Sequence, residues 1–206
     1  MLSVFVDYDG TITDLDTFDV LVRTYAGAHL WHALEQRLEA RTMTLRDVLR
    51  TQAQAIGVSL DEADALLARE TRFDPSFARF AAWCVANAVP LTVVSSGVQP
   101  LIERAFARNG LSGVPILANG IDPSPQGWRF EFRDDSDNGH DKAAAVRAAR
   151  DAGAYTVLRA TARRTTRPRS PRIGDSPKPG GASSAICTNA VSPSRPSSVS
   201  TRSAPR

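Results

Sequence analysis

The sequence predicts an α/β fold: a parallel sheet with helices on both faces and a small helical cap inserted after the first strand. Two short apolar runs, residues 2–6 and 91–94, are typical of buried parallel strands. Between them, residues 17–70 carry apolar side chains at helical spacing. Helical and strand patterns then alternate up to residue 158, which is the order expected of parallel strands joined by crossover helices.

Two sequence signals mark where helices begin. Ser59 and Glu62 are spaced as a capping box before the apolar run 63–67. Asp74 followed by Pro75 places an N-cap before a proline in the first helical turn. The second signal predicts a helix that ends near Asn87.

The elements after this helix complete the predicted sheet. Residues 91–94 form the second strand, which is predicted to stop at Ser95. Trp128, Phe130 and Phe132 alternate with charged residues, so they predict a hairpin strand with one buried face. The remaining predicted elements are helix 99–108, a weaker strand at 116–118, helix 142–152 and a strand at 155–158.

Composition and charge divide the chain into three parts. The predicted α/β core comprises residues 1–13 and 72–158, and residues 14–71 form the predicted helical cap. The first 158 of the 206 residues carry 15 Lys or Arg against 21 Asp or Glu, a net charge of −6. Residues 159–206 carry 10 basic residues and one acid, with ten Ser, seven Pro, no Leu and no aromatic residue. Such a tail buries too little apolar surface to offset its chain entropy, so it is predicted to be disordered.

The formal charge of +3 reflects the tail and does not indicate nucleic-acid binding by the folded part. Nucleic-acid binding by the basic tail is the weakest alternative, because no aromatic residue is present there to stack on bases. Only two cysteines occur, and neither a signal-peptide pattern nor a membrane-length apolar run is present. These features predict a cytoplasmic protein without a membrane partner.

Acidic side chains follow the first predicted strand where it turns into a loop. Asp7 and Asp9 stand two residues apart, before Gly10. Both types are common in turns, but two acids held at a strand end repel each other, a cost usually tolerated when a cation or a reaction uses them. Ser95 follows the second strand, and Lys142 is the sole lysine before the tail. The carboxyl ends of parallel strands carry ligand sites, so these residues predict one site, although Ser95 could cap a helix and Lys142 could be a solvated helix residue.

The motif order DYDGTIT, TVVSSG and GHDK, with a helical insertion after the first, resembles the haloacid dehalogenase superfamily over about residues 2–158. The order is most similar to the branch that contains phosphoserine phosphatase and the diketo-methylthio-phosphopentane phosphatase of methionine salvage. The resemblance implies a Rossmann-like parallel sheet, Asp7 as the nucleophile and Asp9 as the general acid and base. It also implies that Mg²⁺ bridges Asp7, the Asp9 carbonyl and the phosphate. The implied phosphate-binding residues are Thr11, Ser95, Ser96, Gly97 and Lys142.

The tail departs from the family pattern, which places a Gly-Asp-x-x-x-Asp motif with metal-ligating acids after the strand at 155–158. Here no acid follows Leu158 until Asp175. Arg and Pro precede Asp175, and the second Asp of the motif is missing. We therefore interpret the sequence around Asp175 as a decoy, which imitates the motif without its function. Permitted codons for residues 159 onward, read one nucleotide earlier, allow the sequence GDGASD after Leu158. We hypothesise that the tail is an out-of-frame translation, which resequencing the gene would test. The missing segment is also expected to leave residues 91–94 less well covered.

The sequence therefore predicts a Mg²⁺-dependent phosphatase that acts on a small phosphorylated metabolite through an aspartyl-phosphate and is impaired by the missing fourth motif. An inactive remnant that still binds phosphate is the alternative. Ungapped matching to phosphoserine phosphatases puts Asp16 where they use an acid near the substrate amine, but Gln52 where they place a carboxylate-binding Arg. Neutral Gln lacks that bidentate charged contact, so phosphoserine is predicted to be a poor substrate and a sugar-like or keto phosphate a better one.

Overall fold

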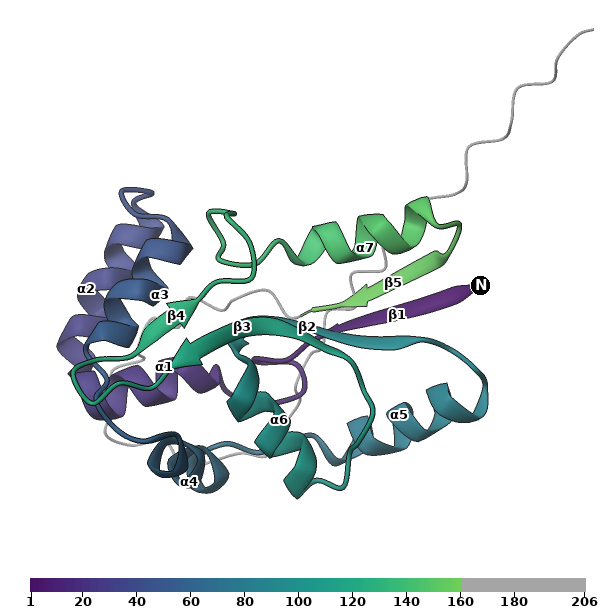
Figure 1. Cartoon of the computed structure of the whole chain (residues 1–206), viewed down its shortest axis with the longest axis horizontal. Coiled ribbons are helices and arrows are strands. Elements are labelled where there is room, and N and C mark those ends of the chain that lie inside the picture. Colours follow the sequence, from purple (N-terminus) through teal and green to yellow (C-terminus); the bar gives the residue numbers. More distant parts are fainter. Residues whose placement is uncertain (161–206) are drawn as a thin grey trace, which may run out of the picture.

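A five-stranded sheet in the order β4-β3-β2-β1-β5 forms the centre of the computed structural model, which describes residues 1–160 (Figure 1). The strand β1 pairs in parallel with β2 and β5, β2 pairs in parallel with β3, and β4 runs antiparallel beside β3. The predicted α/β fold with a mostly parallel sheet is confirmed. The strand bounds are β1 Leu2–Asp7, β2 Leu91–Val98, β3 Ile116–Asp122, β4 Arg129–Glu131 and β5 Tyr155–Arg159.

Helices join these strands in the predicted order. Those between β1 and β2 are α1 Thr17–Leu21, the π-helix η1 Val22–Gly27, α2 Ala28–Glu39, α3 Leu45–Gln54, α4 Leu60–Glu70 and α5 Pro75–Ala86. Those that follow are α6 Gln99–Arg108 and α7 Lys142–Asp151. Both predicted helix starts are confirmed, because Ser59 and Glu62 form the capping box of α4 and the Asp74 side chain accepts from the Ser76 amide before α5.

The strand β2 is longer than predicted. It continues past Ser95 to Val98, with a shift in its register against β3 between Val94 and Val98. The Asn119 side chain donates to the Ser96 carbonyl at 2.8 Å, which keeps this part of β2 attached to β3. The prediction that the strand stops at Ser95 is therefore wrong, because a side-chain bond from the neighbouring strand extends the pairing.

Separate apolar cores cover the two faces of the sheet. On one face, aromatic residues of α5 and α6, including Phe77 and Phe106, pack on β1 and β2. On the other face, Val146 of α7 packs on Phe5 and Val94. Figure 1 shows α7 above the sheet and α5 and α6 below it, so helices cover both faces as predicted.

The helices that follow β1 form a third core with the β3 and β4 end of the sheet. Trp128, just before β4, is fully buried there, and its indole nitrogen donates to the Val58 carbonyl at 2.7 Å. Phe18 of α1 contacts Phe130 of β4, with ring centroids 5.1 Å apart. Figure 1 shows α1, α2 and α3 grouped at this end of the sheet, with α4 beside α6.

The apolar run in β2 is well covered, contrary to expectation. Val93 and Val94 are fully buried, because β2 lies between β1 and β3. Exposed apolar side chains within residues 1–160 include Trp83 and Val85 on α5 and Tyr155, Val157 and Leu158 on the outer strand β5.

The described residues include only Arg159 and Ala160 of the predicted tail, and Arg159 is the last residue of β5. The predicted disorder of the rest of the tail and the decoy motif around Asp175 lie outside the described residues. None of the helices within residues 1–160 combines the length and the apolar character needed to cross a membrane.

Candidate active site

Asp7 lies at the carboxyl end of β1 and is nearly buried. Its Oδ1 accepts the Tyr8 amide at 2.9 Å and the Lys142 Nζ at 2.8 Å. Lys142 is the first residue of α7, and Asp141 caps this helix by accepting from the Ala144 amide. The start of α7 thus delivers the sole lysine of residues 1–160 to the predicted nucleophile.

The groups around Asp7 shift the pKa of its carboxyl in opposite directions. Burial raises the pKa of the Asp7 carboxyl, and the neighbouring Asp9 charge raises it further. The charge of Lys142 and its hydrogen bond lower the pKa, but the net result lies above the ordinary value. Lys142 is therefore the main group that favours the ionised form of Asp7, the form that the predicted nucleophile needs.

Asp9 is held by hydroxyl groups from two elements. Its Oδ1 accepts the Thr17 hydroxyl at 2.6 Å and the Thr17 amide at 2.9 Å, where α1 begins. Its Oδ2 accepts the Ser95 hydroxyl at 3.0 Å. A carboxylate bonded on both oxygens has a fixed orientation, which suits a group that passes a proton.

The Ser95 hydroxyl already makes two hydrogen bonds within the protein. It donates to Asp9 and accepts the Gly97 amide at 2.9 Å. A hydroxyl has one proton, so Ser95 donates to a phosphoryl oxygen only after turning away from Asp9. Gly97 allows this close packing, because a Cβ there would lie 3.1 Å from both Asp9 Oδ2 and Ser95 Oγ.

The turn after β1, which contains Thr11, is closed by backbone hydrogen bonds. The Tyr8 carbonyl accepts the amides of Thr11, Ile12 and Thr13, at 3.2, 2.8 and 3.1 Å. Gly10 adopts φ 68°, in the left-handed region that favours glycine. These bonds hold the turn that carries Thr11. In β2, the Ser96 carbonyl accepts the Asn119 side chain at 2.8 Å.

Asp16 and Gln52 lie on the helices that follow β1. The Asp16 side chain caps α1 and accepts the amides of Phe18 and Asp19, at 3.1 and 3.0 Å. Its predicted role toward a substrate amine would therefore compete with helix capping. Gln52 is fully buried in α3, and neither polar atom of its side chain has a hydrogen-bond partner within residues 1–160.

Several residues of the site were not predicted from the sequence. Thr17 begins α1 and bonds Asp9, and the sequence patterns assign no role to His140 or Asp134. The Asp134 Oδ2 lies 3.2 Å from His140 Nδ1 and accepts the Asp141 amide at 2.7 Å. The one sequence signal for Thr17 is its place behind a capping Asp, and no local pattern identifies Asp134.

The described residues offer few ligands for a metal ion. Across residues 1–160, no three side chains of His, Cys, Asp or Glu gather closely enough to hold one. The oxygen donors of Asp7 and Asp9 have the hard character that Mg²⁺ prefers, but Asp7 Oδ1 and both Asp9 side-chain oxygens already accept protein hydrogen bonds. These residues alone therefore fit only part of a Mg²⁺ site.

A family model described as haloacid dehalogenase-like hydrolase matches residues 4–178. The chain belongs to this family. The haloacid dehalogenase-like match extends 20 residues past Leu158, where the resemblance of the motifs was expected to end, and includes Asp175.

Curated relatives within this family include two named phosphatases. Pdp3-interacting factor 1 of Schizosaccharomyces pombe is 32% identical over 152 residues, 71% of this chain and 66% of that protein. The polyol phosphate phosphatase PYP1 of Saccharomyces cerevisiae is 29% identical over 156 residues, 70% of this chain and 63% of that protein. A 2-hydroxy-3-keto-5-methylthiopentenyl-1-phosphate phosphatase of Microcystis aeruginosa is 31% identical over 156 residues, 75% of this chain and 73% of that protein. The chain spans slightly less than two thirds of the first two relatives.

Solved structures support the haloacid dehalogenase fold. A family hydrolase from Salmonella enterica serovar Typhi has a TM-score of 0.60 at 14% identity, covering 75% of this chain and 54% of its own. A phosphoserine phosphatase solved as a phospho-aspartyl intermediate analogue has a TM-score of 0.57 at 14% identity, covering 77% of this chain and 78% of its own. The Rossmann-like sheet implied by the sequence motifs is confirmed.

Proposed function

We propose that this protein is a phosphatase that hydrolyses a small phosphorylated metabolite through an aspartyl-phosphate intermediate. The observation that carries the proposal is the pairing of Lys142 Nζ with Asp7 Oδ1 at 2.8 Å beside an Asp9 carboxylate bonded on both oxygens. This arrangement supports attack by Asp7 and proton transfer by Asp9, the two roles that the proposed cleavage uses.

The proposed reaction has two steps. Asp7 attacks phosphorus and forms an acyl-phosphate bond while the bond to the leaving oxygen breaks, and protonated Asp9 gives its proton to that oxygen. Asp9 then takes a proton from water, which attacks phosphorus, breaks the acyl-phosphate bond and releases inorganic phosphate. Asp7 returns to its carboxylate form, and Asp9 is again protonated for the next cycle.

Lys142 and the loop after β2 are proposed to hold the phosphoryl oxygens. The Lys142 ammonium neutralises charge on the oxygens and on Asp7. Ser95, Ser96, Gly97 and Thr11 would contribute hydroxyl and amide donors. Since Ser95 already donates to Asp9, phosphate binding would release Asp9 from this bond and leave Thr17 to hold it.

Mg²⁺ is the cofactor implied by the family, and it would neutralise phosphoryl charge when bound. We propose that the Asp7 carboxylate and the Asp9 carbonyl are its ligands from this chain. Two ligands are few for an ion that prefers six oxygens in octahedral geometry, so weak binding is proposed. In the proposed reaction, protein side chains, water and the phosphoryl group therefore account for every proton that moves and every bond that forms or breaks.

The helices that follow β1 are proposed to be the cap that selects the leaving group, as in the predicted division at residues 14–71. Two relatives are named for a polyol phosphate and for a keto phosphate, whose leaving groups carry neutral oxygens. Gln52 carries no charge that could pair with the carboxylate of phosphoserine. We therefore propose a polyol or keto phosphate as the substrate class.

Hydrolysis of p-nitrophenyl phosphate in the presence of Mg²⁺ tests the phosphatase proposal. Turnover is expected, whereas phosphate binding without turnover would favour the inactive remnant. A panel of polyol, keto and amino-acid phosphates then tests the substrate class. If phosphoserine gave the highest kcat/KM, the substrate proposal would be wrong while the phosphatase proposal remained.

A further inference from the structure

The segment of residues 132–141, between β4 and α7, links helix α3 to the candidate active site. Figure 1 shows this segment running from the end of β4, beside α3, to the start of α7. Its last residue, Asp141, directly precedes Lys142. Anything that fixes this segment therefore fixes the position of the lysine.

Arg46 of α3 binds this segment through several independent contacts. Its backbone amide donates to the Asp137 carbonyl at 2.8 Å. Its guanidinium donates to the Asp134 carbonyl and lies 3.3 Å from the Asp135 carboxylate. The same guanidinium lies 4.4 Å from the centroid of the Phe132 ring. One side chain, only 21% exposed, thus touches three residues of the segment.

Asp134 connects the part of the segment that Arg46 contacts to the residues just before α7. Its Oδ1 accepts the Ser136 amide at 3.0 Å, while its Oδ2 accepts the Asp141 amide at 2.7 Å and lies 3.2 Å from His140 Nδ1. Burial works to raise the pKa of Asp134, but hydrogen bonds from Ser136, Asp141 and His140 outweigh it and hold the pKa well below the ordinary value. Asp134 therefore stays ionised and keeps these bonds strong at neutral pH.

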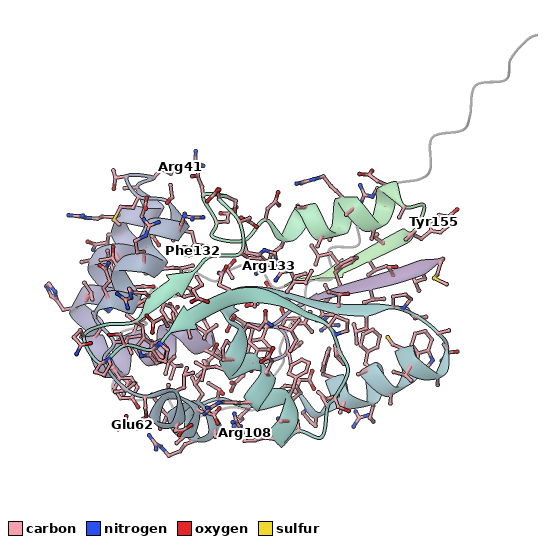
Figure 2. The ribbon with its side chains drawn as sticks, viewed as in Figure 1. Arg41, Glu62, Arg108, Phe132, Arg133 and Tyr155 are labelled. Atoms are coloured by element: carbon pink, nitrogen blue, oxygen red, sulfur yellow. The ribbon has the colours of Figure 1, made fainter. Side chains whose placement is uncertain are left out.

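Phe132 provides a second connection from Arg46 to the same place. Figure 2 shows Phe132 beside α3 at the end of β4. Its ring packs against Gly139, where a Cβ would lie 2.9 Å from ring atoms. Gly139 precedes His140, which is 5% exposed. The backbone just before Lys142 is thus held by a ring that Arg46 covers.

From these contacts we infer that Arg46 is a positioning residue, which holds Lys142 at Asp7 through the 132–141 segment. The inference rests on the proposed function, in which Lys142 binds the phosphoryl group. Helix α3 and the phosphoryl site then act as one unit, so a displacement of α3 would move Lys142 away from Asp7. The helices that receive the leaving group are thereby coupled to the group that holds the phosphate.

Arg50 provides a matched control on the same helix. Its guanidinium lies 5.6 Å from the same Phe132 ring, but its ion pair is with Asp47 of α3, at 2.8 Å. Replacing Arg50 with Met removes a positive charge and a contact with the ring. The hydrogen bonds of Arg46 to the segment are untouched by this change.

The test compares Arg46→Met and Arg50→Met in the full chain, by hydrogen exchange at the Asp141 and Lys142 amides and by the Kd for inorganic phosphate. Arg46→Met is expected to speed exchange and to weaken phosphate binding by about tenfold, because a small misplacement of a binding group is costly. Arg50→Met is expected to change both by less than about twofold. Arg46→Lys should restore only part of the loss, because an ammonium lacks the planar fork that reaches two acceptors.

A double-mutant cycle with Asp134→Asn keeps the test decisive if Arg46→Met lowers the melting temperature. Because both residues act along one path, the double variant is expected to bind phosphate no more weakly than the worse single variant. Additive losses would overturn the inference, as would equal effects of the two Arg→Met changes. Faster exchange with unchanged phosphate affinity would also overturn it. A wild-type chain that binds no phosphate would instead overturn the proposed function, while the exchange data still reported the link from Arg46 to α7.

Discussion

Lys142 Nζ lies 2.8 Å from Asp7 Oδ1, although 135 residues separate them in the sequence. Asp7 ends β1 and Lys142 begins α7, so the pair forms only when both elements pack on the same sheet. Burial alone would favour protonated Asp7, and the ammonium opposes this effect. The fold thus places a cation on one oxygen of a buried carboxylate, which favours the ionised form that the proposed nucleophile needs.

Asp7→Asn is expected to abolish turnover while phosphate still binds. Asparagine keeps the size of the side chain but lacks the charge needed to attack phosphorus, so kcat should fall by about a thousandfold or more. Activity on p-nitrophenyl phosphate and phosphate binding by calorimetry measure the two effects. The control is Asp14→Asn, because Asp14 is exposed and its carboxylate accepts the Arg72 backbone amide at 2.8 Å. Substantial residual activity in Asp7→Asn would exclude covalent catalysis at this residue.

Thr17→Val is expected to lower kcat by about tenfold to a hundredfold, with a smaller change in KM. Valine has the shape of threonine but removes the 2.6 Å bond to Asp9 Oδ1, so the carboxylate that moves the proton is less well oriented. Thr17→Ser retains the hydroxyl and should recover most of the activity. Equal losses in the Val and Ser variants would contradict this role, because Thr17→Ser keeps the hydroxyl that donates to Asp9.

The sequence predicted what local patterns determine. Helix α6 has the predicted bounds, and the capping box at Ser59 is present, because both depend on neighbouring residues. Asp7 and Lys142 were expected at one site because parallel strands end at one edge of a sheet. The bond from Arg46 to the Asp134 carbonyl joins residues 88 apart, and no spacing rule predicts where α3 lies against that segment. Similarly, β2 runs past Ser95 because of Asn119, a residue of the neighbouring strand.

Trp128→Phe is expected to lower the free energy of unfolding by about 2 kcal/mol. The Trp128 side chain is fully buried, and its loss leaves a cavity and an unpaired Val58 carbonyl. Trp83→Phe is the control, because Trp83 is 50% exposed on α5 and should cost less than about 0.5 kcal/mol. Urea denaturation measures both values. Similar losses in the two variants would contradict the role assigned to Trp128 in the third core.

His140 is expected to make stability depend on pH below neutrality. Burial is the main cause that lowers the pKa of His140 below its ordinary value of 6.5, although Asp134 works in the opposite direction. The unfolded chain therefore binds a proton more readily, so His140 contributes stability that is present above pH 6.5 and lost as the pH falls through the folded pKa. The melting temperature should fall less between pH 7 and pH 5 in His140→Gln than in the wild type. His29→Gln, on the exposed side of α2, should retain the wild-type dependence, and an identical profile in His140→Gln would remove His140 as its source.

Mg²⁺ binding is expected to depend on the sequence that follows Leu158. Residues 1–160 supply too few carboxylates for a complete Mg²⁺ site, so this chain is expected to bind Mg²⁺ more weakly than a version that carries the GDGASD segment after Leu158. The exposed apolar side chains of Tyr155 and Val157 on β5 also predict that a segment packing there would raise the melting temperature.

Asp175 is the competing source of a ligand, since the family match includes it. Calorimetric Mg²⁺ titration, hydrolysis of p-nitrophenyl phosphate and thermal melting should therefore compare the wild type, Asp175→Asn and the GDGASD version. We expect Asp175→Asn to leave Mg²⁺ affinity unchanged and the GDGASD version to increase it. If Asp175→Asn removed the Mg²⁺ response instead, Asp175 would be a working ligand, and the interpretation of its motif as a decoy would be wrong.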